Sequence, residues 1–390
     1  MVEVLFIFGL AVAAFVGFNI GGSSTGVAFG PAVGSDTIGK VTAAALMTVF
    51  ALLGGATVGT EVIETMGGQI VPSSQFSLLA SVTVLFFVGL ALLVSNLFGV
   101  PASTSMTAVG AIAGLGVASG TINWEVMGRI ISWWLVAPIV AFWLSAVVGR
   151  YLYPHLAARI VFETDGPGTT RRERIGQFLV VAIGCYMAFS AGASNAANAV
   201  APLVGSGELG LYPGVALAGV AIGAGAFTIA RRTLDTVGND LTELPILAAL
   251  IVETVSATII SLLSAAGIPA SLAVSATMCV VGLGWGRATR TTTLADAAGA
   301  AVSGATPDPE GGGNGLSVDA LTADHEAAVE AADAGGAPPE VAGIGEDQPE
   351  TETTAADLFN PAATGRVVML WILTPSISAV ASYLVFQYVL

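Results

Sequence analysis

The sequence predicts an all-α, polytopic membrane protein made of two inverted repeats with re-entrant or broken helices. Three observations predict this fold class. The composition is strongly apolar, eight apolar runs are long enough to cross a bilayer, and the same motifs occur twice in the same order.

The composition alone excludes an ordinary soluble protein. Hydrophobic residues make up 54% of the 390 residues and charged residues only 10%, whereas a soluble domain is about 25% charged. Because so few charges cannot cover a water-exposed surface, lipid has to cover part of the chain. We therefore expect a multi-pass protein of the cell membrane whose partners are the lipid bilayer and a small solute, with no nucleic acid.

The remaining charge is unevenly distributed. The net charge is −15, Lys40 is the one lysine, and residues 291–360 hold 14 of the 27 acidic residues without any Lys or Arg. Acidic, lysine-poor sequences are typical of a high-salt cytoplasm, which predicts a halophilic archaeon as the source. The alternative is a merely acidic, solvated loop.

The cysteines and histidines argue against an enzyme. Cys185 and Cys279 lie in apolar segments, as ordinary buried small residues do. His155 and His325 lie in polar segments, so no histidine falls in a hydrophobic run. This pattern excludes Ser-His hydrolases, zinc proteases and haem sites, and we expect neither a metal site nor a cofactor other than a coupling Na⁺ or H⁺.

The apolar runs are of two kinds. Those long enough to span the bilayer are 2–19, 41–60, 76–98, 128–152, 175–191, 211–230, 246–266 and 367–390. Shorter stretches rich in Gly, Ser, Asn and Pro lie between them, at 20–36, 101–120, 192–207 and 269–286. Irregular backbone at membrane depth persists only where protein or a cavity surrounds it, so these stretches are candidates for re-entrant or broken helices.

Four pairs of segments repeat. Residues 18–35 align without gaps to 189–206, with eight of 18 positions identical. Residues 63–67 align to 234–238, residues 99–116 to 267–284, and residues 134–138 to 371–375. The larger offset of the last pair indicates an insertion in the second half, which the acidic tract fills.

These observations divide the chain into five parts. Arginines concentrate in the mid-chain loop, which we place in the cytoplasm. The predicted parts are a first transmembrane repeat at 1–153, an Arg-rich cytoplasmic linker at 154–174, a second repeat at 175–290, an acidic disordered insert at 291–360 and the last helix of the second repeat at 361–390.

The repeated motifs carry the chemistry of an anion site. A dehydrated anion needs neutral donors, which hydroxyls, amides and helix N-termini supply. The hydroxyl and amide clusters fall at repeat-related positions where helices are expected to begin. The candidate anion ligands are Ser23, Ser24, Ser103, Thr104, Ser105, Ser194, Asn195, Asn198 and Ser271.

Glu253 is the candidate for cation coupling. It stands in the run ILAALIVETVSATII, which has no other charge. An ionisable residue within a span is costly and is a functional hypothesis by default. Binding a cation, carrying a proton and pairing with another donor all remain open for it.

Several of these segments resemble the PiT family of inorganic phosphate transporters. Its duplicated signature G-A-N-D-x-A-N is similar to Gly192–Asn198 and, in degenerate form, to Gly21–Val27; its P-x-S-T segment is similar to Pro101–Thr104. The resemblance implies two inverted repeats, an anion site between them and cation-coupled symport of phosphate or sulfate. It leaves a homodimer open.

The departures from that signature point to the family's sulfate-permease branch. Ser24 and Asn195 replace the signature aspartates, and Val27 replaces the first asparagine. Hydrogen phosphate can donate a hydrogen bond to a carboxylate, whereas sulfate cannot, so loss of the carboxylates removes repulsion against sulfate. Phosphate and sulfate both remain open as substrates. The alternative function is an uncoupled inorganic anion channel, whose flux would not depend on any cation gradient.

Overall fold

A computed structural model describes residues 2–97, 103–157, 171–230, 246–291 and 361–389, and within these ranges every regular element is a helix. The elements are α1 (Val2–Gly34), α2 (Lys40–Thr57), α3 (Gly59–Glu64), η1 (Thr65–Gln69), η2 (Ser73–Gln75), α4 (Leu78–Leu97), α5 (Thr104–Ala118), α6 (Trp124–Val147), η3 (Val148–Leu152), α7 (Tyr153–Ala157), α8 (Arg171–Gly205), α9 (Leu211–Thr228), α11 (Ile246–Ala265), α12 (Leu272–Thr291) and α15 (Pro361–Tyr388). The acidic tract, apart from its first residue, lies outside the described residues.

The helices have the length and the surface of membrane spans. Six of the described helical segments are long and apolar enough to cross a bilayer. On the outside of α6, Leu135, Ile139 and Trp143 are exposed, as they would be in contact with lipid. The predicted all-α, polytopic architecture is confirmed.

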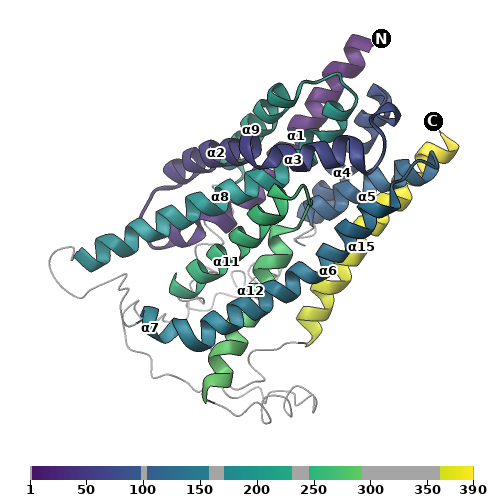
Figure 1. The fold of residues 1–390 in the computed structure, drawn as a ribbon. Helices are drawn as coiled ribbons and strands as arrows, with labels where there is room; N and C mark the ends of the chain where they lie inside the picture. Colours follow the sequence, from purple (N-terminus) through teal and green to yellow (C-terminus); the bar gives the residue numbers. More distant parts are fainter. Residues whose placement is uncertain (1, 98–102, 158–170, 231–245, 292–360, 390) are drawn as a thin grey trace, which may run out of the picture.

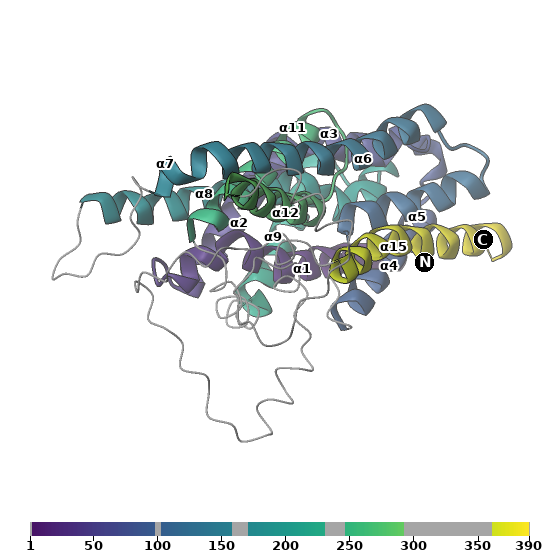
Figure 2. The same ribbon diagram turned by 90° about the horizontal axis from the view of Figure 1, so that it is seen from below.

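The long helices form a bundle in which segments distant in sequence lie side by side (Figures 1 and 2). α1 packs against α9 and α8, and α2 packs against α8 and α9. α5 lies along α15, α6 lies along α12, and α11 joins α8 to α12. The start of α1 and the end of α15 lie at the same end of the molecule (Figure 1).

The helix pairs of the two predicted halves correspond to each other. α1 and α8 carry the matched segments 18–35 and 189–206, and α2 and α9 follow them. α1 packs on α9 just as α8 packs on α2, and α5 packs on α15 just as α12 packs on α6. Two repeats related by a twofold axis would produce these pairs of packed helices. The inverted orientation of the two halves and the division of the chain into five parts stay predictions.

The correspondence extends to single glycine contacts. A Cβ atom at Gly54 of α2 would overlap the carbonyl oxygen of Phe189 in α8. A Cβ atom at Gly225 of α9 would overlap the carbonyl oxygen of Phe18 in α1. Phe189 follows Phe18 in the sequence by the same number of residues as Gly225 follows Gly54. Glycine is therefore required on both sides for the helix backbones to approach closely.

We expect Gly54→Ala to lower the thermal unfolding temperature in detergent by roughly 5 °C, because the added methyl group pushes α2 away from α8. Gly128 of α6 is the matched control, since a Cβ atom there meets nothing within 4 Å. Equal stability of Gly54→Ala and Gly128→Ala would contradict this account of the packing.

Two of the four predicted interruptions are absent. Residues 20–36 and 192–207 were expected to break or re-enter, but α1 and α8 run through them as far as Gly34 and Gly205. Side-chain hydroxyls there bond back to the preceding turn, as Thr25 does to the carbonyl of Gly21 at 2.6 Å, which leaves the helical hydrogen bonds intact. The other two stretches, 101–120 and 269–286, contain the starts of the separate helices α5 and α12.

Candidate functional site

The start of α5 is fixed by its N-cap residue. Ser103 has extended backbone angles, and its hydroxyl oxygen accepts a hydrogen bond from the Met106 amide at 3.3 Å. The hydroxyl of Thr107 donates to the Ser103 carbonyl at 2.8 Å. This cap holds Thr104 and Ser105 in the first turn of the helix, whose positive dipole end favours an anion.

Two asparagines of α8 meet this first turn of α5. Asn195 and Asn198 lie three residues apart, hence on one face of α8, and are 5% and 1% exposed. The Thr104 hydroxyl donates to Asn195 Oδ1 at 2.6 Å. Asn198 Nδ2 donates to Asn195 Oδ1 at 3.0 Å, to Ser105 Oγ at 3.1 Å and to Thr104 Oγ1 at 3.2 Å. We call these four residues the amide–hydroxyl cluster.

The cluster joins one helix from each predicted half, and all of its polar groups are uncharged. It holds two amides and two hydroxyls next to the first turn of α5. Asn195 Nδ2 and the Ser105 hydroxyl proton are donors that these bonds leave available. Neutral donors of this kind can replace the hydration of an anion without holding it too tightly to release.

The other predicted anion ligands lie outside these contacts. Ser23 is exposed and bonds to carbonyls of its own helix at 3.1 and 3.3 Å, and Ser24 is half-buried. Ser194 is buried and bonds at 3.4 Å to the carbonyl of Ala191. Ser271 is buried and caps α12 by accepting from the Val274 amide at 3.3 Å, as Ser103 caps α5.

Glu253 lies on the neighbouring helix. It sits in α11, which packs against α8, and it is 5% exposed. Its Oε2 atom is buried and has no hydrogen-bond partner among the residues that the structure describes, and the same holds for Asn198 Oδ1. The candidate coupling residue and the cluster are thus on helices in contact, each with one unpartnered oxygen.

The sequence reasoning missed two residues that support this region. Trp134 of α6 donates from Nε1 to the Pro269 carbonyl at 2.8 Å, which fixes the segment just before Ser271. Ser190 of α8 donates to the Ala257 carbonyl at 3.0 Å and so ties α8 to α11. A signal for Trp134 existed, because it opens the repeated segment 134–138.

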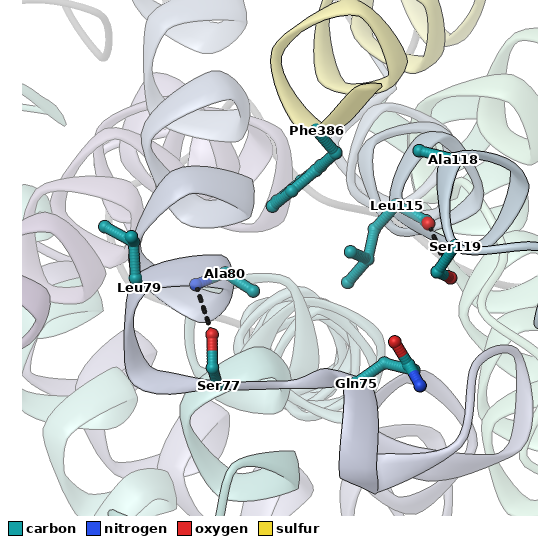
Figure 3. A pocket seen from close by; sticks show the side chains of 8 residues that line it. All are labelled: Gln75, Ser77, Leu79, Ala80, Leu115, Ala118, Ser119 and Phe386. Carbon is teal, nitrogen blue, oxygen red and sulfur yellow. Dashed lines mark hydrogen bonds between the residues drawn. The ribbon is translucent and has the colours of Figure 1, made fainter. Parts of the chain in front are cut away.

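A cavity of about 280 Å³ lies elsewhere. Figure 3 shows Gln75 and Ser77 ahead of α4, with Leu115 and Ala118 of α5 and Phe386 of α15 around the opening. These α5 residues are at the end of the helix opposite to Thr104, about 15 Å or more away along its axis. We therefore do not assign the site to this cavity.

Comparison with known proteins identifies the family. The model of a family described as "Phosphate transporter family" matches residues 20–382, which is nearly the whole chain. The chain belongs to the phosphate transporter family. This is a family of transporters rather than enzymes, so the chain is a multi-pass membrane protein that transports an inorganic anion.

Relatives of this chain are named either as sulfate permease or as phosphate permease. "Sulfate permease CysP" of Bacillus subtilis is 31% identical over 274 residues, which cover 69% of this chain and 74% of that protein. A "putative phosphate permease" of Chlamydia muridarum is 25% identical over 374 residues, which cover 70% of this chain and 88% of that protein. The solved structure entitled "The sodium-dependent phosphate transporter" covers 99% of this chain and all 100% of its own, with a TM-score of 0.67 and 17% identity, and so shares the fold.

Proposed function

We propose that this chain is a cation-coupled symporter of an inorganic tetrahedral oxyanion and that sulfate is its substrate. The observation that carries the proposal is the amide–hydroxyl cluster, in which Asn195 stands at the centre where the family signature has an aspartate. The relative named as a sulfate permease supports the choice of sulfate, and those named as phosphate permeases make phosphate the competing substrate.

The preference for sulfate follows from donors and acceptors. Sulfate at neutral pH has only acceptor oxygens, so each protein group that touches it has to donate. Hydrogen phosphate still carries one proton, and its P–OH group can donate a hydrogen bond to a carboxylate. Because the cluster has an amide in place of that carboxylate, it offers donors to a dianion without repelling it.

The proposal of cation coupling is based on two buried oxygen atoms that have no hydrogen-bond partner in the described part of the chain. A buried acceptor without a donor is costly unless a cation or a proton satisfies it. Glu253 Oε2 and Asn198 Oδ1 lie on helices that pack against each other. A Na⁺ ion or a proton taken up at Glu253 would neutralise the carboxylate while the anion occupies the neighbouring cluster.

Transport by the purified protein in proteoliposomes tests the function. We expect uptake of labelled sulfate that excess unlabelled sulfate inhibits about tenfold more strongly than phosphate does, with Na⁺ and pH gradients imposed separately to identify the driving ion. Stronger inhibition by phosphate would overturn the choice of sulfate. Uptake that follows the sulfate gradient alone, under either cation gradient, would indicate an anion channel.

A further inference from the structure

One face of α1 is covered along its first half and uncovered in its second half. Val12, Val16, Asn19, Ser23 and Val27 follow one another at spacings of three or four residues and so form one stripe along the helix. The first three are buried, whereas Ser23 is exposed and Val27 is 43% exposed. Other helices therefore cover the first part of the stripe and leave the part from Ser23 to Val27 open.

The corresponding face of α8 has no such opening. Ile183, which corresponds to Val12, is half-buried, and Met187, Ser190, Ser194 and Asn198, at the positions that correspond to the rest of the stripe, are all buried. Ser194 corresponds to Ser23 and Asn198 corresponds to Val27. Two faces with a common sequence pattern are therefore covered to different extents.

The difference arises from the short helices that begin in the middle of each half. α5 packs against α8, and the amide–hydroxyl cluster binds the two helices together. Within the described part of the chain, the repeat-related helix α12 makes no comparable packing contact with α1. Leu272 and Ala273, which correspond to Thr104 and Ser105, have no side-chain group that could form such hydrogen bonds.

The position of the uncovered stretch along α1 fixes the side of the membrane. Gly184, in the first half of α8, lies against the Ala28 carbonyl near the end of α1, and Gly9 near the start of α1 lies against Leu203 near the end of α8. The two helices therefore run antiparallel. The first turn of α8 contains Arg171, Arg172 and Arg174, which place this end in the cytoplasm. Ser23 and Val27 therefore lie between the middle of the membrane and the cytoplasm, whereas Asn195 and Asn198 lie toward the outside.

We propose that the α1 face from Ser23 to Val27 lines the cytoplasmic access path of the anion, and that the contact of α5 with α8 closes the outer path. The inference rests on the proposed transport function and adds to it the residues that line the path. The two closures are chemically unequal. The outer one is held by hydrogen bonds, and the inner one would bring the apolar Leu272 and Ala273 of α12 against Val27 of α1. The anion leaves the cluster past Ser23 and Val27 when the outer side is closed.

Thiol labelling tests the path without any transport measurement. In a background with Cys185→Ala and Cys279→Ala, Val27→Cys is exposed to a charged, membrane-impermeant maleimide. In inside-out vesicles we expect it to react about tenfold faster than Ala28→Cys, its buried neighbour on α1. Val220→Cys, exposed in the span of α9, controls for residues that face lipid, where a charged reagent does not reach.

The outer closure has a separate reporter. Ser194→Cys in right-side-out vesicles should react slowly, and its rate should rise about tenfold when Thr104→Val removes the hydroxyl that bonds to Asn195. Thr83→Val is the matched control, because that hydroxyl is exposed and bonds only to its own helix.

The outcomes separate this inference from the proposed function. Slow labelling of Val27→Cys from the cytoplasmic side in a folded, monodisperse protein, or faster labelling from the outside, overturns the access path. An unchanged Ser194→Cys rate in Thr104→Val overturns the outer closure. Both results would leave the sulfate uptake measurements standing, since labelling needs no substrate.

Discussion

Asn195→Ala is expected to lower the rate of sulfate transport about 10- to 100-fold while the protein still reaches the membrane. Asn195 Oδ1 accepts hydrogen bonds from both the Thr104 hydroxyl and the Asn198 amide, and the side chain is almost fully buried. Its removal leaves the buried Asn198 amide and the half-buried Thr104 hydroxyl without this acceptor and misplaces both for the anion. The measurement is initial uptake of labelled sulfate per amount of protein in proteoliposomes.

Two further variants make the result specific. Ser132→Ala removes an exposed hydroxyl that bonds only to the carbonyl of its own helix, and it should transport at the wild-type rate. Asn195→Asp keeps an acceptor for Thr104 and adds a charge. It should raise the ratio of phosphate to sulfate transport about tenfold, because only hydrogen phosphate can donate to the carboxylate. Wild-type transport by Asn195→Ala, or an unchanged ratio in Asn195→Asp, would remove Asn195 from the mechanism.

The fold could be predicted from the sequence because a bilayer leaves few choices. Apolar runs at membrane depth have to be helical to satisfy their backbone groups, so composition and run length already give the helices. The repeats then predicted which helices correspond, and the glycine contacts of Gly54 and Gly225 follow that correspondence. The continuity of α1 and α8 was missed because glycine and serine density was taken as a break, whereas serine and threonine can bond to their own helix.

The candidate site could be predicted in part. The residue types were predicted from the repeated motifs, and the structure brings Thr104, Ser105, Asn195 and Asn198 together. It does not bring Ser24 into that cluster, although Ser24 and Asn195 have the same place in their motifs. Repeat symmetry in a sequence gives equivalent positions but carries no information on which of two equivalent contacts is closed. Which contact is closed depends on how α5 packs against α8 and α12 against α1, and this packing changes with the conformation of the protein.

The two halves differ most in chemistry at the position of Glu253. The corresponding residue of the first half is Leu85, which is fully buried in α4. A leucine is therefore compatible with the packing of this position in one half of the molecule. An acidic residue in the other half brings no comparable packing advantage and adds the cost of a buried, partly unpartnered carboxyl group. A role in transport would explain why that cost is carried.

We expect Glu253→Gln to abolish the accumulation of sulfate above equilibrium while exchange of sulfate across the membrane continues. Glutamine has nearly the same size and can still donate and accept hydrogen bonds, but it can neither carry a proton nor neutralise Na⁺. The measurement compares gradient-driven accumulation with exchange of labelled for unlabelled sulfate in the same proteoliposomes. Glu208→Gln, a change to an exposed carboxyl group after α8, should leave both processes unchanged.

Glu253→Leu separates coupling from folding. Because Leu85 fills the equivalent position, we expect this variant to fold and to unfold at a higher temperature than the wild type, since it no longer buries an unpartnered oxygen. It should lack accumulation just as Glu253→Gln does. A variant that is more stable yet unable to couple would show that the carboxyl group of Glu253 is kept for transport at the expense of stability. Accumulation at the wild-type level in either variant would place the coupling ion elsewhere.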